Sequence, residues 1–82
     1  MKKLVENIDK NSSEQTIINQ IEKQNDGYHT DQGGREFYYQ ADGNHLNQIF
    51  CDDEDGDDTI YWSVASVEWN GIADKFEVQL SC

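Results

Sequence analysis

The chain has 82 residues, hydrophobic residues make up 35% of it, and its formal net charge is −11. A chain of this length forms one domain with one thin core, which leaves no room for two lobes around a deep cleft. No apolar run is long enough to cross a membrane. A surface this acidic repels nucleic acid and anionic lipid, so it favours basic proteins as partners.

The charge is unevenly distributed along the chain. Residues 1–41 hold seven acidic and five basic residues, a net of −2. Residues 42–82 hold ten acidic residues and a single base, Lys75, a net of −9. The acidic character therefore belongs to the C-terminal half.

The front of the chain is predicted to be helical. Ser12 with Gln15 three residues later matches a capping box, and Gly27 is typical of a helix stop. Between them, isoleucines recur at helical spacing: Ile17, Ile18 and Ile21. These signals predict a helix over residues 13–25 with the isoleucines facing the core. Leu4, Val5 and Ile8 show the same spacing, so residues 2–10 are predicted to be a separate helical turn or an extension of this helix.

The back of the chain is predicted to form strands. Segments with aromatic, β-branched or alternating apolar residues cover 35–40, 46–51, 59–69 and 76–80. Asp42 followed by Gly43 is typical of a hairpin turn between the first two segments. Asn70 followed by Gly71 is typical of a turn between the last two.

The last hairpin has two candidate registers. A two-residue Asn-Gly loop places Tyr61 opposite Leu80. An odd-length loop places Trp62 opposite Leu80 and Val64 opposite Val78, which gathers more apolar area on one face. Because a one-residue slip turns every side chain to the other face, only one register can form. Burial of a tryptophan contributes about 2 kcal/mol or more, so the odd loop is favoured.

These elements predict an α+β fold in one domain spanning residues 1–82. One or two N-terminal helices pack on an antiparallel sheet of three to four strands. Lys2 and Lys3 are not followed by the apolar segment of a signal peptide, which favours the cytoplasm. Two cysteines are few for a disulfide-stapled secreted protein, so Cys51 and Cys82 are predicted to be free thiols, with one bridge between them as the alternative.

The strongest local feature is the acidic run, residues 52–58. Six of its seven residues are carboxylates: Asp52, Asp53, Glu54, Asp55, Asp57 and Asp58. Their mutual repulsion predicts an exposed segment that is mobile when unbound. Three interpretations are open, namely a solvated connecting loop, a contact surface for a cationic partner and a Ca²⁺ loop.

The Ca²⁺ interpretation does not fit the EF-hand pattern. If Gly56 takes the sixth position, the first falls on Cys51 and the twelfth on Trp62, where a bidentate glutamate is required. The flanking segments are also predicted strands rather than helices. We therefore expect no EF-hand and no cofactor, and a weak, non-specific divalent site is the remaining metal alternative.

The contact-surface interpretation has a geometric basis. An extended chain rises ~3.3 Å per residue, and DNA places a charge every ~3.4 Å along each strand. The acidic run can therefore approximate a phosphate backbone and occupy a groove built for nucleic acid. Four further acids extend the patch if they share its face: Asp42, Glu68, Asp74 and Glu77.

Apolar anchors would supply the specificity of such a contact. The candidates are the aromatic residues of the strands that do not face the core, drawn from Tyr38, Tyr39, Tyr61, Trp62 and Trp69. From these, Tyr61 and Trp69 join the six carboxylates as predicted partner-binding residues.

Catalysis has little support in the sequence. His29 and His45 are isolated in polar surroundings, with no neighbour at metal-ligand spacing. Cys51 adjoins the acidic run, which raises the pKa of a thiol and disfavours the thiolate. The glycines at 33 and 34 lack the strand–helix context of a phosphate loop. We predict no enzyme, no catalytic residue and no metal site.

In size, charge, α+β outline and lack of catalytic motifs, the chain resembles the small acidic inhibitors encoded by phages and mobile elements, including anti-CRISPR proteins and other DNA mimics. The resemblance depends mainly on the six carboxylates of the acidic run. It implies a non-enzymatic inhibitor of a basic nucleic-acid-binding protein, such as a nuclease or a CRISPR effector, that works in the host cytoplasm and does not bind nucleic acid itself. An immunity protein that neutralises a basic toxin and a Ca²⁺-binding structural module are the alternatives.

Overall fold

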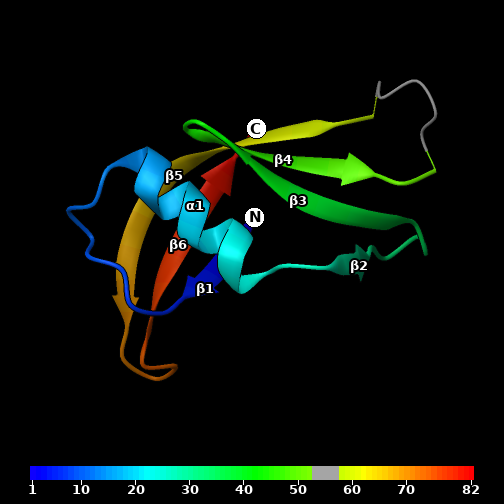
Figure 1. Ribbon diagram of the computed structural model, residues 1–82. Helices are drawn as coiled ribbons and strands as arrows, with labels where there is room; N and C mark the ends of the chain where they lie inside the picture. Colours follow the sequence, from blue (N-terminus) through cyan, green and yellow to red (C-terminus); the bar gives the residue numbers. More distant parts are fainter. Residues whose placement is uncertain (53–57) are drawn as a thin grey trace.

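The computed structural model describes residues 1–52 and 58–82, and these form one helix and six strands (Figure 1). In chain order they are β1 (Lys2–Val5), α1 (Glu14–Gln24), β2 (Tyr28–Thr30), β3 (Glu36–Asp42), β4 (His45–Phe50), β5 (Ile60–Asn70) and β6 (Lys75–Ser81). The α+β class is as predicted. The sheet has more strands than the three or four expected, and a single helix accompanies it.

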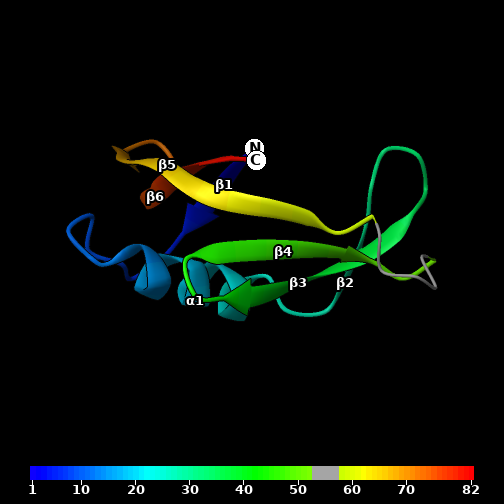
Figure 2. The same ribbon diagram turned by 90° about the horizontal axis from the view of Figure 1, so that it is seen from above.

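The six strands form one antiparallel sheet in the order β1-β6-β5-β4-β3-β2. The sheet curls into an open half-barrel, and α1 lies along its concave face (Figures 1 and 2). The two sides of the curl approach each other at Tyr39, because the ammonium of Lys3 lies 4.6 Å from the centre of the Tyr39 ring. The Tyr39 hydroxyl also donates to the sulfur of Met1, at 3.8 Å. The helix thus packs inside the curled sheet, where side chains from the β1 end contact Tyr39 of β3.

Helix α1 begins and ends close to the predicted limits. Ser13, rather than Ser12, caps its N-terminus, and the Ser13 hydroxyl accepts a hydrogen bond from the backbone N–H of Thr16 at 3.2 Å. The three predicted isoleucines are buried against the sheet: Ile17, Ile18 and Ile21. At 11 residues α1 is too short to cross a membrane, and the described part of the chain contains no other helix that could.

The helix predicted over residues 2–10 is wrong. Residues 2–5 form β1, which pairs with β6 and places Lys3 opposite Val78. Val5 is fully buried whereas Leu4 is 45% exposed, because successive residues of a strand face opposite sides of the sheet. Two adjacent apolar residues in so short a segment are compatible with a helix or with a strand. Pairing with β6, more than 70 residues away, makes the segment a strand.

The β3–β4 hairpin is confirmed, with a tight two-residue connection. Asp42 pairs with His45, and Gly43 at the turn has φ of 59°. This left-handed backbone suits glycine, which explains the turn signal at this position. Strand β2 was not predicted, because its three residues, Tyr28–Thr30, are too few to show a pattern.

Neither predicted register describes the β5–β6 hairpin. The connection has four residues, Gly71–Asp74, so Asn70 pairs with Lys75. The Asn70 side-chain oxygen accepts from the backbone N–H groups of Ile72 and Ala73, both at 3.1 Å, and it thereby closes a longer turn than the Asn-Gly pair predicts.

A β-bulge at Ala65 also shifts the register of this hairpin. On one side of it Val64 pairs with Leu80, and on the other Val67 pairs with Val78. The extra residue lets both valines face the concave side although an odd number of positions separates them. Consequently Tyr61 and Trp69, an even number of positions apart, lie on opposite faces of the sheet.

The core fills the space between α1 and the concave face of the sheet. Its buried residues are Val5, Ile8, Ile17, Ile18, Ile21, Phe37, Tyr39, Leu46, Phe50, Val78 and Leu80. One buried polar side chain on this face is satisfied, because the Gln48 amide oxygen accepts from the Trp62 indole N–H at 3.0 Å. The core thus draws on the helix and on every strand except β2 and β5, which contribute partly buried residues.

Polar contacts fix the position of α1 within the curl. The Gln24 side chain donates to the backbone oxygen of Glu6 at 2.7 Å and accepts from its N–H at 2.8 Å. One amide thereby pairs with the backbone as a neighbouring strand would. On the other side, the Glu22 carboxylate accepts from the backbone N–H of Ala41, where β3 extends beyond β2.

We expect Gln24→Ala to lower the free energy of unfolding by about 1 kcal/mol, since both hydrogen bonds to the backbone of Glu6 are lost. Gln15→Ala is the matched control, because Gln15 is exposed on the same helix and the gain in helix propensity is the same. Urea denaturation followed by circular dichroism measures both variants. Equal stabilities of the two variants would contradict a docking role for Gln24.

Candidate functional site

The two ends of the acidic run are held by one arginine. Nη2 and Nε of Arg35 donate to the two carboxylate oxygens of Asp52, at 2.9 and 3.2 Å. Nη2 also donates to Asp58 at 2.9 Å. We call Arg35, Asp52 and Asp58 the arginine clamp. The clamp joins the first and last residues of the run, so the chain leaves β4 and returns toward β5 at the same corner of the sheet (Figure 1).

The loop before β3 places the guanidinium of the clamp. The Asp31 side-chain oxygen accepts from the backbone N–H groups of Gly33 and Arg35, at 2.9 and 2.8 Å, which fixes a compact turn after β2. The guanidinium then lies over the ring of Phe50, 4.1 Å from its centre. The clamp therefore depends on a local turn and on an aromatic ring from the end of β4.

The clamp changes the protonation properties of its neighbours. Hydrogen bonding to Arg35 lowers the pKa of Asp52 and raises the pKa of Arg35 itself. The Asp52–Arg35 pair therefore stabilises the fold at neutral pH, and its contribution is lost as the pH falls through the lowered pKa of Asp52. Desolvation by neighbouring atoms raises the pKa of the Cys51 thiol, and the carboxylates of Glu36 and Asp52 raise it further. This thiol is protonated at neutral pH and is a weak nucleophile.

Of the six predicted carboxylates, Asp52 and Asp58 belong to the clamp. The other four, Asp53, Glu54, Asp55 and Asp57, lie outside the described residues. By sequence they add four negative charges between the two clamped ends.

Three tyrosines lie on the convex face of the sheet, opposite α1, next to this corner. Tyr61 is 57% exposed and Tyr28 is 71% exposed. Tyr28 pairs with Tyr38 across β2 and β3, and their rings meet edge to face with centres 6.1 Å apart. We call Tyr28, Tyr38 and Tyr61 the tyrosine face. Tyr28 was missed by the sequence reasoning because it lies in a strand too short to be predicted.

One buried polar group lies within the tyrosine face. Asn47 pairs with Tyr61 across β4 and β5 and is 7% exposed. Its side-chain oxygen has no hydrogen-bond partner among the described residues. An unpaired buried acceptor costs about 1–3 kcal/mol, so this side chain lowers the stability of the fold.

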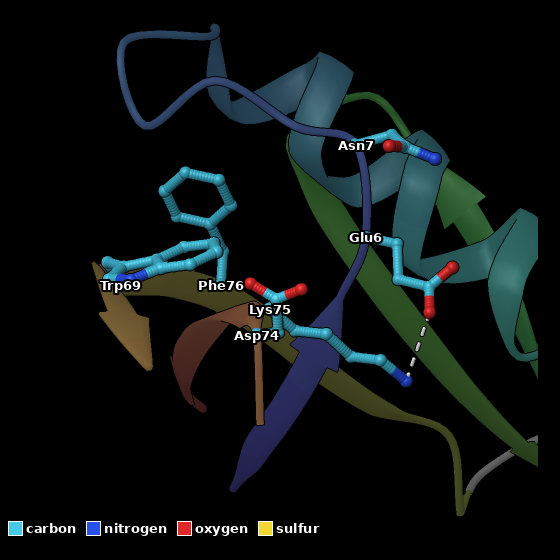
Figure 3. Close-up of a pocket in the computed structure, with 6 residues that line it drawn as sticks. All are labelled: Glu6, Asn7, Trp69, Asp74, Lys75 and Phe76. Atoms are coloured by element: carbon cyan, nitrogen blue, oxygen red, sulfur yellow. Dashed lines mark ion pairs between the residues drawn. The ribbon is translucent and has the colours of Figure 1, made fainter. Parts of the chain in front are cut away.

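Trp69, the second predicted anchor, lies far from the acidic run. It is eight residues beyond Tyr61 on β5, about 26 Å along the strand, and on the concave face. It lines a hollow of about 400 Å³ between the turn after β1 and the β5–β6 hairpin (Figure 3). The structure therefore separates Trp69 from Tyr61 and from the clamp, although the sequence reasoning grouped them.

The further acids of the C-terminal half do not extend the acidic run. Glu68, Asp74 and Glu77 belong to the β5–β6 hairpin, and Asp42 belongs to the β3–β4 hairpin. Glu68 and Glu77 are paired across the two strands, with Lys2 at 3.4 Å from Glu77. The negative charge is thus divided between separate ends of the molecule, and a single face of phosphate-like charge does not form from these four residues.

The histidines and cysteines form no reactive arrangement in the part of the chain described. His29 lies in β2, stacked on Phe37 with ring centres 5.6 Å apart, and His45 is exposed at the start of β4. Cys51 and Cys82 are free and exposed. Within residues 1–52 and 58–82, His, Cys, Asp and Glu side chains form no group of three that would hold a metal ion.

Comparison of the chain with protein-family models, with curated proteins and with solved structures found no match.

Proposed function

We propose that this protein is a non-enzymatic inhibitor that binds a basic, nucleic-acid-handling enzyme through its acidic corner. The observation that carries the proposal is the arginine clamp, which holds both ends of a six-carboxylate run at one corner of the sheet. Negative charge concentrated at one place steers a cationic surface toward it and speeds association. Only the acidic run would then imitate a phosphate backbone, because the acidic residues of the β3–β4 and β5–β6 hairpins lie away from it.

The tyrosine face supplies the contacts that outlast the first encounter. Tyr28 and Tyr61 are exposed, and the strand register places them on the face of the sheet opposite to the core residues. Tyrosine combines a large apolar ring with a hydrogen-bonding hydroxyl, and it is enriched among residues that dominate binding energy. The negative charge at the arginine clamp and the neighbouring tyrosine face together favour a protein partner with a basic groove.

The test uses two variants with the same change in net charge. The run variant replaces Asp53, Glu54, Asp55 and Asp57 by their amides and leaves the clamp intact. The remote variant replaces four acids that lie away from this corner by their amides: Glu14, Asp42, Glu68 and Glu77. Proteins captured from a lysate on the immobilised wild-type chain are eluted with a salt gradient and identified by mass spectrometry, and the purified partner is then used for affinity and inhibition measurements.

We expect the run variant to bind the partner at least about tenfold more weakly, mainly through slower association, and to lose inhibition. The remote variant should retain most of the affinity. Binding by the wild type should weaken steeply with salt, because exposed charges are screened beyond ~8–10 Å at physiological ionic strength. Equal weakening in both variants, or binding that is insensitive to salt, would contradict the proposal.

Tyr61→Ala separates the two parts of the surface. We expect it to speed dissociation while leaving the salt dependence of association unchanged, since it removes apolar area and no charge. Surface plasmon resonance with the purified partner measures both rates. A Tyr61→Ala variant with unchanged dissociation would exclude the tyrosine face from the interface.

A further inference from the structure

A second candidate binding site lies in the hollow beside Trp69, which the proposed function does not use. It is lined by Glu6, Asn7, Trp69, Asp74, Lys75 and Phe76 (Figure 3). One wall comes from the turn after β1 and the other from the β5–β6 hairpin, so two segments distant in sequence form it. We call these six residues the Trp69 hollow.

Aromatic rings form the hairpin wall of the Trp69 hollow. The rings of Trp69 and Phe76 meet edge to face, with centres 5.0 Å apart and planes inclined at 70°. Phe76 is half-buried against the core, whereas Trp69 remains 55% exposed. An indole is the aromatic group that attracts cations most strongly, and this one is held in place by its neighbour.

The charges in the Trp69 hollow are only partly neutralised. The Lys75 ammonium lies 3.2 Å from Glu6 and is directed toward it, away from the rings (Figure 3). Asp74 has no ion pair or hydrogen bond to another described side chain. The lining therefore carries a net charge of −1, with the uncompensated carboxylate on the same hairpin as the exposed indole.

We infer that the Trp69 hollow binds an arginine side chain of a partner protein. A guanidinium is planar and weakly hydrated, so it can stack on the indole of Trp69 while donating to the carboxylate of Asp74. A lysine ammonium is compact and strongly hydrated, so it exploits the flat indole less well. The inference shares with the proposed function only the assumption of a basic partner, and it depends on different residues at another end of the molecule.

The experiment titrates the full chain at low salt with the peptide acetyl-Gly-Arg-Gly-amide. Proton–nitrogen NMR spectra follow the indole N–H signals of the two tryptophans. Trp62 is an internal control, because its indole N–H is bonded to Gln48 within the core. We expect the Trp69 signal to shift saturably, with a dissociation constant of roughly 1–10 mM, while the Trp62 signal barely moves.

Two substitutions of one charge each test the carboxylate. Asp74 has a left-handed backbone, with φ of 56°, which asparagine tolerates, so Asp74→Asn removes the charge and keeps the turn. Asp42→Asn removes the same charge from the β3–β4 hairpin. We expect Asp74→Asn to weaken binding of the arginine peptide about threefold and Asp42→Asn to leave it unchanged.

Comparison with acetyl-Gly-Lys-Gly-amide tests the aromatic part. We expect the wild type to bind the arginine peptide more tightly than the lysine peptide, and Trp69→Leu to abolish that preference, read from the backbone amide signals of residues 74 and 75. Equal shifts of both tryptophan signals, no preference for arginine, or identical effects of Asp74→Asn and Asp42→Asn would each overturn the inference.

The run variant separates this inference from the proposed function. It retains every residue of the Trp69 hollow, so we expect its titration with the arginine peptide to match that of the wild type. Failure of the peptide titration leaves the result of the run-variant test unaffected, and failure of the run-variant test leaves the titration unaffected. The two outcomes are therefore distinguishable.

Discussion

Replacing Ile18 by alanine is expected to lower the free energy of unfolding by about 3 kcal/mol. Ile18 is fully buried at the middle of α1, against the concave face of the sheet. The loss combines the transfer of its side chain to water with the cavity that remains. An 82-residue chain has a total stability of about 4–12 kcal/mol, so this substitution removes a large fraction of it.

Asn19→Ala is the matched control for this substitution. Asn19 follows Ile18 on the helix but is exposed, so its replacement should change the stability by less than about 0.5 kcal/mol. Urea denaturation of both variants gives the two free energies, and an unchanged denaturant slope shows that the unfolded state is comparable. A loss below about 1 kcal/mol for Ile18→Ala would contradict the packing of α1 inside the curl.

Added salt is expected to raise the melting temperature of this protein. With a net charge of −11 on 82 residues, repulsion within the folded chain opposes compactness. Between about 0.01 M and 1 M sodium chloride, the screening length falls from ~30 to ~3 Å, which removes most of this repulsion. We expect a gain of about 1–2 kcal/mol, equivalent to a rise of about 5–10 °C for a chain of this size.

The ion pairs of the protein act in the opposite direction and are weaker. Those of Lys2 with Glu77 and of Lys75 with Glu6 lie on the surface, where each contributes about 0–1 kcal/mol. Differential scanning calorimetry of the wild type and the run variant measures the balance. The run variant carries four fewer negative charges, so its melting temperature should depend less on salt. A melting temperature that falls with salt would show that attraction, rather than repulsion, dominates.

Local signals in the sequence identified the elements that nearby residues stabilise. The isoleucines of α1 and a serine cap lie within one stretch of chain, and the helix formed as predicted to within a residue or two. The β3–β4 hairpin likewise depends on a turn at Gly43 between two adjacent strands. The acidic run is a property of composition, and its charge is visible without any structure.

Elements that form through contacts with distant parts of the chain could not be predicted from local sequence signals. Strand β1 has four residues and is a strand because β6 pairs with it. In the β5–β6 hairpin, the sequence reasoning correctly sought a register that gathers apolar side chains on one face. That reasoning did not allow for a β-bulge. The extra residue, Ala65, brings the apolar side chains of β5 to one face although the turn has four residues.

The candidate site likewise contains some residues that the sequence predicted and others that only the structure revealed. The carboxylates and Tyr61 were named from the sequence, whereas the arginine clamp and Tyr28 were not. Arg35 is separated from Asp52 and Asp58 by 17 and 23 residues, and only the antiparallel order of β3, β4 and β5 places them together. The separation of Trp69 from Tyr61 follows from the bulge, since an even spacing along a regular strand would leave both on one face.

The sequence by itself determined the α+β class, the amphipathic helix and the excess of negative charge in the second half of the chain, because each is set by composition or by residues within a few positions of one another. Only the tertiary structure decided how that charge is divided: one part at the clamped corner beside the tyrosine face, another on the β5–β6 hairpin beside Trp69. The physical reason is that strand pairing and a single bulged residue set which side chains share a face, and both depend on contacts between distant parts of the chain.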